Sequence, residues 1–204
     1  MTKIGLISDM HASPAPLQEA LSLFEGQGVD WVLCAGDIAG YGEQLDETVE
    51  ILKASEVISI LGNHDIWFVD EHPDADACDY LNSLPGYYQT KIEGIKLYMA
   101  HASPPESVSG GIKLLDKDGN LLQERKKEWS QKLTGFSHDV LVLGHTHQVF
   151  SEQLANTLAI NPGSSKFNHT CAILSLPNMA VEVFALSGKT PVKVWNWSAA
   201  FADS

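Results

Sequence analysis

The sequence has one arginine, Arg125, and it contains no long apolar run, no CxxC pair and no internal repeat. No apolar run approaches the roughly 20 residues that a membrane-spanning helix needs, so we expect no membrane association. Three cysteines, Cys34, Cys78 and Cys171, are an odd number without metal-binding spacing, which argues against a disulfide framework. Nothing after Met1 resembles a signal peptide. We therefore expect a cytoplasmic protein.

Positive charge is scarce and unevenly placed. The net charge is −13 with a pI near 4.8, which opposes binding to nucleic acid or to an anionic membrane. Six of the 13 basic residues lie in 113–132. This segment is either the solvated face of a helix or a basic surface near a substrate phosphate. The residues that would form such a surface are Lys113, Lys117, Arg125, Lys126 and Lys127.

The first 65 residues alternate between strand and helix patterns. With 204 residues, 44% of them hydrophobic, we expect one globular domain over 1–204. Apolar runs ending at polar residues predict three strands, and stripes with helical spacing predict two helices between them. This alternation is typical of parallel strands and an α/β fold. The predicted strands span 3–8, 31–35 and 57–61, and the helices span 14–26 and 43–54.

The second half changes to an α+β pattern of short strands separated by turns. A hairpin is predicted over 87–100, and further strands over 140–143, 149–154, 157–160, 170–176 and 181–186. The stretches 66–86 and 104–136 have a weaker core pattern, and we interpret them as cap-like insertions; the second includes a helix over 120–134.

The C-terminal segment Val192–Trp197 is compatible with either of two structures. It could form a final strand, or an exposed apolar patch that a dimer would bury. A monomer and a homodimer are both left open.

Metal-ligating side chains follow the predicted strands. In α/β sheets, ligands bind at the loops after the carboxyl ends of parallel strands. Asp9/His11 and His145/His147 are i, i+2 pairs, and in extended chain both side chains of such a pair point the same way. Five of the eight histidines belong to this set, which chance does not explain. The full set is Asp9, His11, Asp37, Asn63, His64, His101, His145 and His147.

Seven of these residues, all except His64, are too many donors for one tetrahedral ion and about right for two ions. Oxygen and imidazole donors without cysteine suit Mn²⁺, which we expect, or Fe²⁺, Zn²⁺, Ni²⁺ or Co²⁺. Two divalent ions would outweigh the charges of Asp9 and Asp37, giving a pocket suited to an anionic substrate. Ions roughly 3.5–4 Å apart can clamp the oxygens of an in-line displacement at phosphorus.

The motifs between residues 9 and 147 resemble those of the calcineurin-like metallophosphoesterase superfamily. In chain order they are SDMH, GDIAG, GNHD, the isolated His101 and GHTH. The later strands with Asn161-Pro162-Gly163-Ser164 are similar to its small single-domain prokaryotic phosphodiesterases and phosphatases. The resemblance implies a four-layer αββα sandwich, in which two mixed sheets pack face to face with helices outside.

The resemblance also implies roles for individual residues. Asp9, His11 and His147 would hold one ion and Asn63, His101 and His145 the other, with Asp37 bridging them. A metal-bridging hydroxide would attack phosphorus, and His64 would stabilise the transition state or protonate the leaving oxygen.

The chain departs from the superfamily patterns at three places. In protein Ser/Thr phosphatases, an Asp and an Arg continue the GD motif. Both are missing after Asp37, which argues against phosphoprotein phosphatase activity. Asp65 is then the candidate partner of His64. Ala102 follows His101 where Gly-His is common, and Lys166 is the candidate substitute for an arginine found after Asn-Pro-Gly-Ser.

The leading hypothesis is a two-metal phosphoesterase that acts on a small phosphodiester or phosphomonoester, such as a nucleotide. The lack of an arginine clamp favours diesters. Candidate substrate contacts are Asn63, His64, Lys166 and Arg125. The alternatives are a dinucleotide polyphosphate hydrolase, a non-catalytic metal-binding scaffold of the same fold, and a nuclease, against which the acidic charge argues. A metallo-β-lactamase-type hydrolase would need an HxHxDH run, which is absent.

Overall fold

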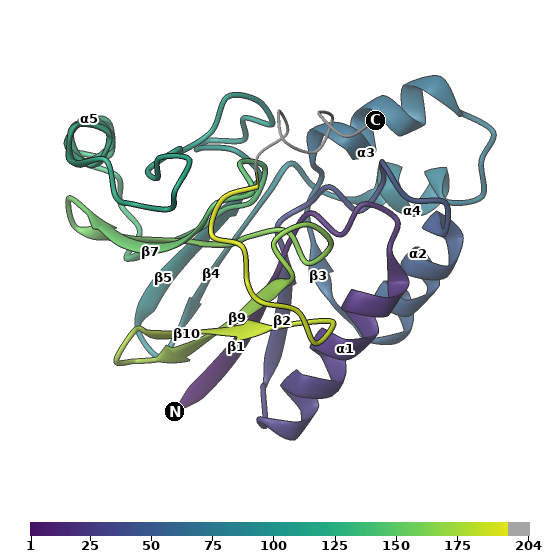
Figure 1. Ribbon diagram of the computed structural model, residues 1–204, viewed down its shortest axis with the longest axis horizontal. Helices are drawn as coiled ribbons and strands as arrows, with labels where there is room; N and C mark the ends of the chain where they lie inside the picture. Colours follow the sequence, from purple (N-terminus) through teal and green to yellow (C-terminus); the bar gives the residue numbers. More distant parts are fainter. Residues whose placement is uncertain (196–204) are drawn as a thin grey trace.

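Two five-stranded mixed sheets form the centre of the protein, whose computed structural model describes residues 1–195 (Figure 1). The first sheet has the order β10-β9-β1-β2-β3, with β1, β2 and β3 parallel and β9 antiparallel to β1. Its strands are β1 (Thr2–Ile7), β2 (Trp31–Cys34), β3 (Ile58–Ser59), β9 (Thr170–Leu176) and β10 (Ala180–Ala185).

The second sheet has the order β4-β5-β6-β8-β7. Its three central strands, β5, β6 and β8, are parallel, and the two outer strands run antiparallel to their neighbours. The strands are β4 (Tyr87–Ile92), β5 (Ile95–Ala100), β6 (Val140–Val142), β7 (Val149–Leu154) and β8 (Thr157–Pro162).

Helices cover the outer face of each sheet, which confirms the predicted four-layer sandwich (Figure 1). A core that includes Leu6, Leu33, Met99 and Val142 lies between the two sheets. The first sheet is covered by α1 (Pro14–Gly26), α2 (Leu45–Ala54), α3 (Asn63–Glu71) and α4 (Cys78–Ser83), and the second by α5 (Gln123–Lys132) with the coil around it.

The sequence-based prediction was wrong about the region after Ser59. The strand predicted over 57–61 is reduced to two residues, and Asn63 begins a helix that no pattern had indicated. The cause is local: Asp65, in the first turn of α3, accepts a 2.8 Å hydrogen bond from the Gly62 N–H. The polar run Asn63-His64-Asp65 is thus a helix start. Residues 66–86 continue through α3 and α4, which contribute Phe68, Leu81 and neighbouring side chains to the outer core.

The end of the described chain lies beside the loop after β6. Val194 makes a single antiparallel bridge with Gln148, and the Trp195 N–H donates to the His147 carbonyl over 3.1 Å. Residues 192–195 are therefore not a full strand, and the last two residues of the predicted segment lie outside the described part of the chain. Within residues 1–195, no helix has the length and apolarity to cross a bilayer.

Candidate metal centre

The metal-ligating residues predicted from the sequence gather at one end of the sandwich, where loops from both sheets meet. Asp9 and His11 follow β1 and Asp37 follows β2, while His101 follows β5 and His145 comes three residues after β6 ends. All seven are buried except His145, which is half-buried. Buried polar groups need partners, and the partners here are mostly one another.

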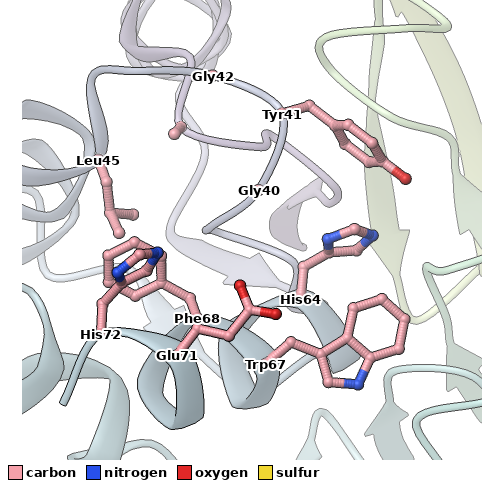
Figure 2. A pocket seen from close by; sticks show the side chains of 10 residues that line it. Gly40, Tyr41, Gly42, Leu45, His64, Trp67, Phe68, Glu71 and His72 are labelled. Carbon is pink, nitrogen blue, oxygen red and sulfur yellow. The ribbon is translucent and has the colours of Figure 1, made fainter.

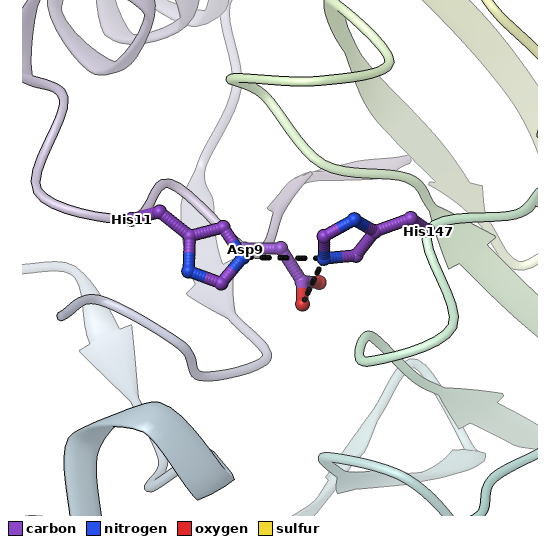
Figure 3. A group of neighbouring side chains, drawn as sticks. All are labelled: Asp9, His11 and His147. Carbon is purple, nitrogen blue, oxygen red and sulfur yellow. Dashed lines mark hydrogen bonds and ion pairs between the residues drawn. The ribbon is translucent and has the colours of Figure 1, made fainter. Parts of the chain in front are cut away.

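The first cluster consists of Asp9, His11 and His147 (Figure 3). His147 Nε2 lies 3.2 Å from His11 Nε2 and 3.2 Å from Asp9 Oδ1. Ligand atoms about 2.1 Å from a shared ion, at right angles to one another, lie about 3 Å apart. The spacing of these three donors therefore fits a single divalent ion.

The second cluster consists of Asp37, Asn63, His101 and His145. Asn63 Oδ1 lies 3.2 Å from His101 Nε2 and 2.8 Å from His145 Nδ1, while His101 Nε2 is 3.3 Å from Asp37 Oδ1. If the Asn63 amide were turned over, its nitrogen would donate to both imidazoles. With a cation among these donors, the oxygen is the atom that must face it, so the set fits a second ion.

Asp37 lies between the two clusters. On one side, its carboxylate lies close to His101 and His145, and on the other side it lies close to His11 and His64. Within each of these two sets the ligand atoms lie within 4.8 Å of one another. This position supports a bridging role for Asp37, although ligation itself stays a prediction.

Backbone carbonyls orient two of the imidazoles. His11 Nδ1 donates to the Ala39 carbonyl over 3.0 Å, and His101 Nδ1 donates to the Ala35 carbonyl over 2.6 Å. Because each Nδ1 donates to a carbonyl, each Nε2 is the ring atom directed into the cluster. The rings are thereby arranged as ligands before any ion binds.

Four residues that support the site were given no role by the sequence analysis. The hydroxyl of Ser8 donates to Asp9 Oδ2, and that of Ser164 donates to the Asp9 carbonyl. Asn161 Nδ2 donates to the Gly144 carbonyl, and Asn168 Nδ2 donates to the His147 carbonyl. The available signal was the Asn161–Ser164 run at the end of an apolar strand, but the pattern does not say what these side chains bind.

The i, i+2 pairs do not use extended backbone, which corrects the geometric basis of the sequence prediction. Asp9 and His11 have φ values of 51° and 45°, and His145 and His147 have 63° and 48°, all in the left-handed region. Left-handed residues turn the chain sharply after each strand, and that turn is what directs both side chains inward. Gly62 permits the close approach of the loops, because a side chain there would collide with the Asp37 carboxylate.

Burial and ion pairing shift the pKa values of the cluster in opposite directions. Burial by itself would raise the pKa of Asp9, but the charge of His147 and a hydrogen bond from it hold that pKa well below the ordinary value. Burial acts against the charged form of His101, yet Asp37 raises its pKa to about 9. Burial lowers the pKa of His11 and of His145 to about 4. The Asp9 carboxylate is therefore charged and ready to hold a cation.

His64 lies at the edge of the centre, in the first turn of α3. Its backbone N–H donates to Asp37 Oδ1 over 2.8 Å, and its half-buried ring faces a cavity of about 200 Å³ that Asp37, Asn63 and His145 also line. Burial lowers the pKa of this ring, and Asp37 opposes that shift. The His64 ring therefore lies beside the predicted metal ligands but is not one of them.

Asp65 is not the partner of His64, so that expectation is wrong. Its two carboxylate oxygens accept hydrogen bonds from the Ala39 N–H over 2.7 Å and from the Gly62 N–H over 2.8 Å. Asp65 therefore fixes the loops after β2 and β3, and with them the positions of Asp37 and Asn63.

The two basic candidates for substrate contact lie in different places. Lys166 Nζ donates to the His11 carbonyl over 3.2 Å, so its charge is next to the first cluster. Arg125 lies on α5, over the outer face of the second sheet, and forms an exposed ion pair with Glu128 at 3.2 Å. Substrate contact by either residue stays a prediction.

Comparison with known proteins gives a consistent assignment. A family model described as "Calcineurin-like phosphoesterase superfamily domain" matches residues 2–179. The chain is 24% identical over 196 residues to phosphodiesterase YfcE of Escherichia coli, covering 93% of this chain and 95% of that protein. The crystal structure of a metallophosphoesterase from Sphaerobacter thermophilus superposes with a TM-score of 0.70 at 22% identity, over 92% of this chain and 90% of that one.

The same fold also occurs in a protein whose name indicates another role. Vps29 of Entamoeba histolytica, in a crystal structure described as a zinc complex, matches with a TM-score of 0.60 at 18% identity. That match covers 93% of this chain and 95% of the Vps29 chain. At such identities these structural likenesses show the fold alone.

Proposed function

The chain belongs to the calcineurin-like phosphoesterase superfamily, and on that premise we propose that it hydrolyses a small phosphodiester or phosphomonoester with the help of two divalent metal ions. The observation that carries this proposal is the convergence of seven ligand side chains in two clusters that meet at Asp37. A structural zinc site, for comparison, is one closed set of four ligands. Two adjoining sets open to a cavity suit catalysis better.

The residues present fit such ions. Asp9, His11 and His147 would hold one, Asn63, His101 and His145 the other, and Asp37 both; Mn²⁺ is our expectation, with Fe, Zn, Ni and Co as alternatives. Bound ions would supply a water of lowered pKa and would neutralise the non-bridging oxygens of the phosphoryl group.

His64 supplies the part of the chemistry that belongs to the protein itself. The Asp37 hydrogen bond fixes the backbone of His64, and the ring faces the cavity that the second cluster lines. From there the imidazole can hydrogen-bond to the phosphoryl group or give a proton to the departing ester oxygen.

A preference for diesters follows from the charges around the cavity. Among the described residues, none that lines the cavity beside Asn63 and His64 is a lysine or an arginine. Lys166, the nearest basic candidate that we identified, is directed at the His11 carbonyl. A diester carries one negative charge, which two ions can balance without further cations, whereas a monoester carries close to two.

The test compares hydrolysis of bis-p-nitrophenyl phosphate and p-nitrophenyl phosphate by metal-stripped protein refilled with Mn²⁺. We expect turnover to return with metal, to favour the diester, and to fall by about 1,000-fold in Asp37→Asn, because losing several kcal/mol of charge stabilisation costs tenfold per 1.4 kcal/mol. Asp118→Asn, in an exposed turn, is the matched control. Protein that holds two metal ions and hydrolyses neither ester would contradict the proposal and favour a scaffold.

A further inference from the structure

A second cavity adjoins the metal centre on the far side of His64 (Figure 2). It has a volume of about 300 Å³ and lies between the 40–42 turn and α3. His64, Tyr41 and Trp67 line both this cavity and the smaller one beside the metal ligands, so the two spaces meet at these three side chains. We call this second space the α3 cavity; the other residues that matter below are Gly40 and Glu71.

Aromatic rings stand on either side of His64 at this junction. The Tyr41 ring centroid is 4.7 Å from that of His64, and the Trp67 centroid is 4.8 Å from it on the other side. Both rings are large hydrophobic groups left open to solvent, with Tyr41 54% and Trp67 53% exposed. Exposed aromatic rings at the mouth of a cavity provide surfaces on which a planar group can stack.

The backbone holds this arrangement in place. Tyr41 has a φ of 45°, in the left-handed region that a bulky side chain rarely adopts. Gly40, with a φ of 98°, brings the turn so close that an added Cβ would lie 2.7 Å from His64 Nδ1. Strained residues that the surrounding structure maintains are common at ligand sites.

The one fixed charge on the α3 cavity disfavours an anionic occupant. Glu71 is the only side chain of fixed charge on its described lining, and that charge is negative. The residues outside the described part of the chain, 196–204, include no lysine or arginine either. A second phosphate would therefore meet Glu71 with no cation to balance it. An uncharged ring could instead stack on the aromatic side chains and donate an N–H or O–H to the Glu71 carboxylate.

We propose that the α3 cavity is the leaving-group subsite of the reaction and that it takes a planar, uncharged ring; the proposal rests on the function proposed above. In hydrolysis a water oxygen bonds to phosphorus and loses a proton, the bond from phosphorus to the ester oxygen breaks, and that oxygen takes a proton from His64, which regains one from solvent as the water's proton is released. Since His64 lines both cavities, a group leaving from the metal side past this ring enters the α3 cavity. The ring has two sources, the base of a nucleoside or a simple phenol.

The first experiment measures binding to the metal-free protein, so that its result does not depend on catalysis. Adenosine, phenol, choline and glycerol are compared by saturation-transfer NMR. We expect one or both rings to bind, and choline and glycerol not to bind. Adenosine alone would assign a nucleoside, and phenol alone a simple aryl group. Binding of choline in preference to both rings, or of no ring at all, would overturn the proposal.

Variants then locate the binding. Trp67→Ala should weaken ring binding by about tenfold, as expected for loss of one stacking partner, while Trp67→Phe should stay close to the parent protein. Trp31→Ala removes a comparably exposed tryptophan on β2 and is the control. Equal binding by the parent protein and Trp67→Ala would overturn the assignment.

A third measurement reverses the charge. Glu71→Lys should shift preference from adenosine towards adenosine 3′-monophosphate, whereas the parent protein should prefer the uncharged nucleoside. If the parent protein preferred the phosphorylated ligand, the charge argument would be wrong. If the rings bind as expected and no ester is hydrolysed, the proposed function fails and the α3 cavity remains a ring-binding site without a leaving-group role.

Discussion

Two polar regions of the sequence lie in opposite environments in the structure, one buried and one exposed. The residues that follow the central strands, Asp9 to His147, converge in a buried cluster and are each other's neighbours. The basic residues of 113–132 lie on the outside of the second sheet, where Arg125 and Lys132 both pair with Glu128 and Lys126 pairs with Glu152.

The difference lies in what each group would lose without a partner. A buried carboxylate or imidazole costs free energy unless something compensates it, so a fold retains a cluster of them only where the groups satisfy one another or hold an ion. Exposed side chains are solvated whether paired or not, and their pairs contribute little. Burial together with convergence, not charge alone, indicates a site. Each of the following experiments tests one side of this contrast.

Removing the imidazole of His64 should have the largest effect of the three. We expect His64→Asn to lower kcat by about 100- to 10,000-fold, because general acid–base catalysis contributes that much. Metal content should be unchanged, since His64 is not among the seven predicted ligands. Kinetics and metal analysis on the same preparation check both points. His138→Asn, on the outer side of the second sheet, is the control. Loss of metal in His64→Asn would instead make this residue a ligand.

A smaller effect is expected when a supporting residue is removed. Asn161 Nδ2 donates to the Gly144 carbonyl over 2.7 Å and to Thr146 Oγ1 over 3.2 Å, and so fixes the loop that carries His145 and His147. Asn161→Ala should weaken metal affinity by about 10- to 100-fold, the usual cost of losing a group that orients ligands.

Titration of the metal-free protein with Mn²⁺ measures that affinity. Asn156→Ala, in the exposed turn between β7 and β8, should bind the ion as the parent protein does. An Asn161→Ala protein that matched the control would show that the loop holds its shape without this side chain.

Much of the site could be predicted from the sequence because its residue types are informative where they stand. Carboxylate, amide and imidazole groups directly after apolar strands have few structural uses, and parallel strands bring their carboxyl ends to one edge. The fold followed from the same alternation together with the resemblance to a known superfamily. Both depend on short-range patterns that a single sequence displays.

What could not be predicted depends on contacts between distant residues. Ser164 is 155 positions from the Asp9 carbonyl to which it donates, and no local pattern indicates that pairing. The left-handed conformation of His11 arises from the loop in which it lies, since only a small share of histidines adopt it although they do so more often than most residues. The role of Asp65 was misjudged for the same reason, because its partner Ala39 lies 26 positions away.

The smallest effect should come from the basic segment. Replacing Arg125, Lys126 and Lys127 together with Gln should change KM by less than about twofold, because the first two already pair with Glu128 and Glu152. If these side chains bound substrate, replacing them would instead raise KM and leave kcat unchanged, because such contacts stabilise the ground state and the transition state alike. Steady-state kinetics should be measured at low ionic strength, because screening is weakest there and any effect of these charges on KM is largest. An unchanged KM there would assign α5 to the solvated surface, and a raised one would extend the site across the outer face of the second sheet.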